Sequence, residues 1–142
     1  MAELRVLGLD HVVLRVRDLD AALGFYRDLL GCPVERELAE LGLHQLRAGS
    51  GMIDLVPVDS PLGRAGGAAA GSEGRNVDHV CLRIDPFDPA ELKALLARHG
   101  IEASDVAERY GADGTGPSVY VQDPDGNTVE LKGPPSSPPI SA

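Results

Sequence analysis

The sequence predicts an α+β protein built from two tandem β-α-β-β-β modules that form a curved, mostly antiparallel sheet. Two observations predict it: a segment that occurs twice, and a helix-ending glycine that follows each copy at nearly the same distance. Residues 9–16 (LDHVVLRV) recur as 77–84 (VDHVCLRI). Gly31 and Gly100 lie 20 and 21 residues after the histidines of the two copies. Internal similarity of this kind indicates that one structural unit has been duplicated.

Both copies of the repeated segment are expected to be β-strands. Apolar and polar residues alternate with a period of two, as in a strand with one buried face. The alternation places His11 and Arg15 on one face of the first strand, and His79 and Arg83 on the corresponding face of the second. Each histidine is therefore expected on the more polar face of its sheet.

A helix is expected after each of these strands. An aspartate begins each helix, Asp18 or Asp20 in the first and Asp88 in the second, because a short acidic side chain accepts hydrogen bonds from the first free backbone N–H groups. Pro89 then takes the first helical position of the second helix. The leucines that follow have helical spacing, which predicts one buried face for each helix.

Each module is expected to close with three strands. Gly49–Ser50–Gly51 and the sequence DPDG at 123–126 are typical of turns between paired strands. The expected strands are 34–39, 43–47 and 52–58 in the first module, and 106–110, 118–122 and 127–132 in the second.

One domain is expected over residues 1–133, with module one at about 6–58 and module two at about 77–133. The linker between them, 59–76, is rich in glycine and alanine and has no hydrophobic period. The tail, 134–142, has four prolines in nine residues and is expected to be disordered.

The composition argues against nucleic acid as a partner and against a membrane-spanning, secreted or disulfide-rich protein. The net charge of −9 and the absence of any lysine and arginine cluster argue against binding to nucleic acid. No apolar run approaches the roughly 20 residues that a membrane span needs. The charged N-terminus lacks the core of a signal peptide, and two isolated cysteines do not form a disulfide framework. A cytoplasmic location is therefore expected.

Two histidines and two carboxylates occupy equivalent positions in the modules. His11 and His79 follow the repeated aspartate, and the segments MIDL and TVEL each place a carboxylate, Asp54 or Glu130, between aliphatic residues. A carboxylate in an apolar strand is costly unless a cation or a donor meets it. If the modules pair about a pseudo-twofold axis, these groups line a cleft with ligands suited to Ni, Zn, Co, Mn or Fe.

The segments DHVVLRVRDLDAALGFYRDLLG, MIDLV, VDHVCLRI and YVQDPDGNTVEL resemble the vicinal oxygen chelate superfamily over residues 9–132. That superfamily includes glyoxalase I, extradiol dioxygenases and bleomycin-binding proteins. The resemblance implies a divalent metal held by His11, His79 and Glu130, with Asp54 at the position of the fourth ligand. Glyoxalase I has a longer glutamate at that position, so Asp54 either binds the ion directly, binds it through water, or does not bind it.

The resemblance also implies an activity. A metal-dependent lyase or isomerase similar to glyoxalase I chelates two adjacent oxygens of a small substrate and stabilises an enediolate. Glu130 is the expected catalytic base. Arg15 corresponds to an arginine that holds a glutathione carboxylate, although a salt bridge to an acidic residue of this chain is an equal alternative. Tyr120 either lines the cleft or packs in the core.

The implied substrate is a small molecule such as a glutathione adduct or another thiol adduct, and the implied assembly is a homodimer. Two alternatives stay open. One is an Fe(II) extradiol-type dioxygenase, although many of these enzymes are about twice this length. The other is a non-catalytic drug-binding or metabolite-binding protein of the bleomycin-resistance type, against which the complete set of metal ligands argues.

Overall fold

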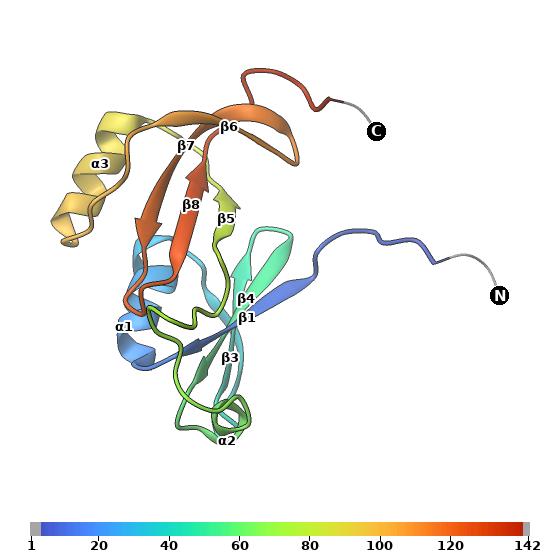
Figure 1. The fold of residues 1–142 in the computed structure, drawn as a ribbon, viewed down its shortest axis with the longest axis vertical. Helices are drawn as coiled ribbons and strands as arrows, with labels where there is room; N and C mark the ends of the chain where they lie inside the picture. Colours follow the sequence, from blue (N-terminus) through green and yellow to red (C-terminus); the bar gives the residue numbers. More distant parts are fainter. Residues whose placement is uncertain (1–3, 141–142) are drawn as a thin grey trace. The chain divides into compact units, whose positions relative to one another are not determined.

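The chain divides into two compact units, Met1–Asn76 and Val77–Ala142, and the computed structural model describes residues 4–140. Each unit contains one four-stranded sheet and its own helices (Figure 1). This arrangement confirms the expected α+β class and the repeated β-α-β-β-β module. No helix within residues 4–140 is long and apolar enough to cross a membrane.

The sheet of the first unit has the strand order β1-β4-β3-β2. β1 pairs in parallel with β4, whereas the pairs β4–β3 and β3–β2 are antiparallel, so the sheet is mostly antiparallel as expected. The strands are β1 (His11–Val16), β2 (Val34–Leu38), β3 (Leu43–Ala48) and β4 (Gly51–Pro57).

The sheet of the second unit repeats this topology in the order β5-β8-β7-β6. Its first strand is again parallel to its last, and the other two pairs are antiparallel. The identical topology of the two sheets agrees with the duplication read from the sequence. The strands are β5 (Val80–Arg83), β6 (Ala107–Gly111), β7 (Gly114–Gln122) and β8 (Thr128–Lys132).

The helix after β1 differs from the expected continuous α-helix. Asp18 caps α1 (Leu19–Leu23) by accepting a hydrogen bond from the backbone N–H of Ala21, but the chain then continues as the π-helix η1 (Gly24–Leu29). In η1 the neighbouring residues Phe25 and Tyr26 both lie in the core, where each is at least 97% buried. A prediction from 3.6-residue periodicity has no means of detecting this change.

The helix of the second unit agrees with expectation. In α3 (Pro89–Arg98), the Asp88 side chain accepts from the backbone N–H of Glu91 and a proline occupies the first turn.

The linker contains a short helix that the sequence analysis did not expect. In α2 (Pro61–Arg64), the Ser60 side chain accepts from the backbone N–H of Gly63. A Cβ atom at Gly63 would lie 1.9 Å from the carbonyl oxygen of Pro57, so only glycine fits there. The signal for this turn was the Ser–Pro pair at 60–61, a short sequence that helical periodicity does not detect.

One face of each sheet packs into an apolar core, and the opposite face carries polar side chains. The apolar residues alternate along the strands as expected, and the helices supply the rest of each core. The most buried members are Leu14, Val16, Leu46, Ile53 and Leu55 in the first unit, and Leu96, Val121, Val129 and Leu131 in the second. We call the opposite face of each sheet its polar face; it carries the residues of the candidate site.

The described part of the tail lies along β7. The backbone N–H of Thr115 donates to the carbonyl of Ser137, and that of Ser136 donates to the carbonyl of Thr115. The tail thus forms one short antiparallel bridge to β7 beyond the end of β8, in a segment whose composition predicts disorder.

Candidate functional site

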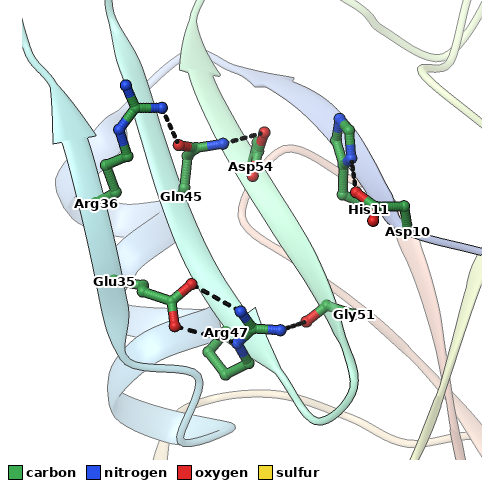
Figure 2. A network of polar contacts seen from close by, with 8 residues as sticks. All are labelled: Asp10, His11, Glu35, Arg36, Gln45, Arg47, Gly51 and Asp54. Carbon is green, nitrogen blue, oxygen red and sulfur yellow. Dashed lines mark hydrogen bonds and ion pairs between the residues drawn. The ribbon is translucent and has the colours of Figure 1, made fainter.

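The first His–carboxylate pair, His11 and Asp54, lies on the polar face of the first sheet. His11 begins β1 and pairs with Met52, and Val13, the next residue on the same face, pairs with Asp54. The parallel pairing of β1 with β4 thus places an imidazole and a carboxylate on adjacent strands (Figure 2). The His11 side chain is 46% exposed, whereas Asp54 is only 2% exposed.

A row of polar side chains holds Asp54 from the other side. Gln45 donates through Nε2 to Oδ2 of Asp54 at 3.2 Å, and Arg36 donates to Oε1 of Gln45 at 3.2 Å (Figure 2). The other oxygen of Asp54, Oδ1, is buried and accepts no hydrogen bond from any described residue. A buried carboxylate oxygen is costly unless a donor or a cation meets it, and a bound cation would satisfy this one.

The aspartate before His11 orients its ring. Nδ1 of His11 lies 2.6 Å from Oδ2 of Asp10. This hydrogen bond raises the pKa of His11, and the negative charge of Asp54 raises it further. Because an ionised carboxylate only accepts hydrogen bonds, Nδ1 carries the proton and Nε2 of the neutral ring keeps a free lone pair.

The second pair, His79 and Glu130, repeats this arrangement on the polar face of the second sheet. Nδ1 of His79 lies 2.6 Å from Oδ2 of Asp78, and Nε2 of His79 lies 3.3 Å from Oε1 of Glu130. Glu130 is 5% exposed. The second pair therefore presents an imidazole nitrogen and a buried carboxylate oxygen side by side.

Cys81 lies next to the second pair, directly opposite Glu130 in the β5–β8 register. Although the residue as a whole is exposed, desolvation of its thiol and the adjacent Glu130 carboxylate raise its pKa to about 11. Cys81 is therefore a neutral thiol near pH 7. Cys32 is buried and also free, in agreement with the expectation that no disulfide forms.

Tyr120 lies on the same polar face as the second pair. It is the β7 partner of Glu130, and its ring meets the His79 ring edge-on at 5.6 Å between centroids. Arg109 covers the Tyr120 ring, with its Cζ 4.3 Å from the ring centroid. Tyr120 is thus on the polar side of its sheet, as one of the two sequence-based readings expected.

Arg15 has a different environment. Its Nη1 donates to the carbonyls of Gly66 and Ala68 at 3.1 Å each, and Nη2 donates to the carbonyl of Gly67. The guanidinium therefore fastens the linker to the polar face, and its partners among the described residues are backbone carbonyls, not an acidic side chain.

His44 and Gln45 lie on opposite faces of β3. His44 is buried on the core side, with Nδ1 3.4 Å from Oε1 of Glu37, so it is remote from the polar face. Gln45 contacts Asp54 directly.

Sequence reasoning missed Asp10, Asp78 and Arg109. The two aspartates were visible as an identical position of the repeat, and the signal was their place directly before each histidine. Arg109 had no signal, because its relation to Tyr120 depends on the pairing of β6 with β7.

The donors of the two pairs fit a divalent ion by their chemistry. Imidazole nitrogen and carboxylate oxygen suit Zn, Ni, Co, Mn and Fe, and the buried Oδ1 of Asp54 accepts no hydrogen bond from the described residues. In the part of the chain that the structure describes, no three histidine, cysteine, aspartate or glutamate side chains converge on one point. Each unit by itself therefore supplies a pair of donors.

The chain belongs to the Glyoxalase/Bleomycin resistance protein/Dioxygenase superfamily, which matches residues 8–131. This confirms the resemblance to the vicinal oxygen chelate superfamily. The virulence protein STM3117 of Salmonella typhimurium is 27% identical over 128 residues, 87% of this chain and 81% of that protein.

Solved structures show the same fold. An integron cassette protein from Vibrio cholerae, VCH_CASS1, is similar with a TM-score of 0.72 and 25% identity, over 93% of this chain and 98% of that one. A lactoylglutathione lyase from Agrobacterium tumefaciens has a TM-score of 0.65 and 25% identity, over 91% and 95%. The superfamily thus includes enzymes, and its members commonly use a divalent metal and small-molecule substrates.

Proposed function

We propose that this protein is a metal-dependent lyase or isomerase, similar to glyoxalase I, that binds two adjacent oxygens of a small substrate. The proposed ligands of its divalent ion are the four side chains of the two His–carboxylate pairs: His11, Asp54, His79 and Glu130. One observation carries the proposal: in each unit a buried carboxylate lies beside a histidine whose Nδ1 is already bound to the preceding aspartate. Nε2 of each histidine is thereby left as the donor atom.

A divalent ion, when bound, supplies a Lewis acid that stabilises negative charge on adjacent substrate oxygens. Glu130 is the proposed base, which takes a proton from the substrate carbon beside the carbonyl and returns it to the neighbouring carbon. Its Oε1 is next to Nε2 of His79, and its burial excludes water from the carboxylate.

Calorimetric titration of the full chain, stripped of metal by a chelator, tests the proposal. Ni²⁺, Zn²⁺, Co²⁺, Mn²⁺ and Fe²⁺ are titrated separately at pH 8, into the wild type and into His79→Ala. His99→Ala is the matched control, because His99 is exposed and its Nδ1 lies only near the carbonyl of Leu95. We expect near-stoichiometric binding by the wild type and by His99→Ala, and its loss in His79→Ala. Binding no tighter than that of His79→Ala would overturn the proposal.

The loaded protein is then assayed for isomerisation of the hemithioacetal of methylglyoxal and glutathione. Turnover that is abolished in Glu130→Gln, with metal still bound, supports the role of Glu130 as base. Equal turnover in the wild type and in Glu130→Gln would assign the proton transfer to another group.

We also propose that the protein is a homodimer, as superfamily members often are. Sedimentation of the full chain measures the assembly, and mixing His11→Ala with His79→Ala chains tests how the pairs combine. If one ion takes its ligands from two copies, each mixed dimer regains one intact set and metal binding recovers. If the ligands come from one chain, mixing restores nothing.

A further inference from the structure

Arg109 lies on the polar face of the second unit, close to the second His–carboxylate pair. Its Cζ lies 4.3 Å from the centroid of the Tyr120 ring, and that ring lies 5.6 Å from the His79 ring. Two successive ring contacts therefore connect the guanidinium to the proposed metal ligand.

The Arg109 guanidinium is held firmly on one side and has donors left on the other. Nη1 donates to the carbonyl and to Oγ of Ser118, each at 2.9 Å. Its Nε and Nη2 make no hydrogen bond within the described residues, and no carboxylate there lies within ion-pair distance. By contrast, the guanidinium of Arg47 pairs with Glu35 at 2.8 Å. In a chain with 22 acidic residues, this arginine is held in place by a neutral serine and pairs with no carboxylate of the described residues.

A second cation reinforces the positive charge at this place. Lys132 is 3% exposed, and its Nζ donates to the carbonyl of Arg109 and, at 3.0 Å, to that of Gly116. Burying an ammonium group is costly. The equivalent position of the first unit, two residues after Asp54 as Lys132 is after Glu130, holds the apolar Val56. The second unit thus has a cation where the first has an apolar side chain, and this ammonium braces β6 and β7 beside Arg109.

We propose that Arg109 binds an oxyanion, the carboxylate or phosphonate group of the same substrate whose adjacent oxygens lie at the second pair. The planar fork of a guanidinium matches the oxygens of either group, and the Tyr120 ring fixes its plane. This inference rests on the proposed function and narrows it, since it makes the substrate a small anion with two adjacent oxygens at its other end. Arg109 is a specificity-determining residue in this scheme.

Three probes of one shape test the inference on the metal-loaded full chain: catechol, 3,4-dihydroxybenzoate and 3,4-dihydroxyphenylphosphonate. Each has two adjacent oxygens, and the second and third add a carboxylate or a phosphonate at the far side of the ring. Calorimetry with the wild type is expected to give at least tenfold tighter binding of one anionic probe than of catechol. The anionic probe whose affinity exceeds that of catechol by the larger factor identifies the preferred oxyanion.

Three variants distinguish a loss of anion binding from a loss of folding or of metal binding. Arg109→Met is expected to remove the preference and to keep the affinity for catechol, and Arg109→Lys to keep part of the preference. Arg83→Met is the matched control, because Arg83 already pairs with Asp113 at 2.5 Å, and it should keep the full preference.

Two negative outcomes are distinguishable. If the metal binds and the wild type binds all three probes equally, or if Arg109→Met keeps the preference, this inference is overturned and the proposed function stands. If no metal binds, the proposed function fails and the inference fails with it.

Discussion

Nδ1 of His79 lies 2.6 Å from Oδ2 of Asp78, and Nδ1 of His11 lies at the same distance from Oδ2 of Asp10. The duplication has therefore kept the histidine together with the group that sets its tautomer. A carboxylate that accepts from Nδ1 leaves Nε2 as the unprotonated nitrogen and limits rotation of the ring. The geometry is present in each unit independently.

Removal of this carboxylate is expected to weaken metal binding. Asp78→Ala should reduce metal affinity by about 10- to 100-fold, because His79 loses both its orientation and its preferred tautomer. Asp78→Asn should lose less, since the amide oxygen still accepts from Nδ1. Calorimetry at pH 8 checks both, with Asp105→Ala, an exposed aspartate of a loop, as control. Unchanged affinity in Asp78→Ala would show that the contact does not orient the ring.

The same experiment at Asp10 needs control of pH. The hydrogen bond from His11 to Asp10 raises the pKa of His11, so protons compete with metal at a higher pH than for a free histidine. Asp10→Ala weakens this competition, since the charge of Asp54 still raises the pKa of His11, and it also removes the orientation of the ring. At pH 8 the loss of orientation should dominate and affinity should fall, whereas near pH 6 the two effects oppose each other.

Asp54→Asn is expected to stabilise the metal-free protein. The Asp54 carboxylate is 2% exposed, and its Oδ1 accepts no hydrogen bond within residues 4–140. A neutral amide loses less solvation on burial than a carboxylate, and it can still accept from Gln45. The free energy of unfolding at pH 8, measured with urea, should rise by about 1 kcal/mol.

With added metal, the wild type should instead become more stable than Asp54→Asn. A ligand that binds only the folded state stabilises it, and the wild type should gain more than Asp54→Asn because it binds the ion more tightly. Asp105→Asn, at an exposed position, should follow the wild type in both conditions. If Asp54→Asn were less stable than the wild type without metal, and if added metal stabilised both proteins equally, Asp54 would have a structural role only.

The repeat explains why so much of this fold could be predicted. The alternation in residues 9–16 and 77–84 specifies strands, and two copies of the same pattern predict the same topology twice, as the two sheets confirm. The placement of Asp54 and Glu130 on the polar faces followed from the same period of two. These features depend on residue type and spacing, which the sequence states directly.

Other features depend on backbone groups or on contacts between distant strands. The partners of Arg15 are carbonyls of Gly66, Gly67 and Ala68, and a carbonyl is present at every residue, so residue type gives no signal for them. The π-helix η1 is a change of backbone hydrogen bonding that the spacing of apolar residues does not signal. The stacking of Arg109 on Tyr120 depends on strand register, which spacing along the chain does not determine.

Arg15→Ala is expected to loosen the linker. The substitution removes donors to three consecutive carbonyls, so residues 65–76 should open more often. Limited digestion with trypsin, which cuts after Arg64 and Arg75, should proceed several-fold faster than in the wild type. Arg98→Ala, at the exposed end of α3, is the matched control and should not alter cleavage in the linker. Equal cleavage rates in Arg15→Ala and the wild type would mean that other contacts hold this segment.

Cys81 is expected to react slowly with alkylating reagents in the metal-free protein. Burial, and then the Glu130 carboxylate, raise its pKa from 9.0 to about 11. At pH 8 the thiolate fraction of Cys81 is therefore about 100-fold smaller than that of a cysteine with the ordinary pKa. A more basic thiolate is a better nucleophile, which raises the rate by about tenfold. The alkylation rate should then be about tenfold below that of an ordinary cysteine.

Iodoacetamide alkylation of a Cys32→Ala background, followed as a function of pH, should give a midpoint near pH 11. Glu130→Gln should move the midpoint downward, because a neutral neighbour no longer opposes the thiolate, but not to 9.0, because burial is the larger cause. The raised pKa also affects stability, because the folded state holds the thiol proton more tightly than the unfolded chain does. The resulting contribution of Cys81 to the free energy of unfolding is complete below pH 9 and disappears as the pH rises through 11. A midpoint near 9 in both proteins would show that the thiol is fully hydrated and does not contact Glu130.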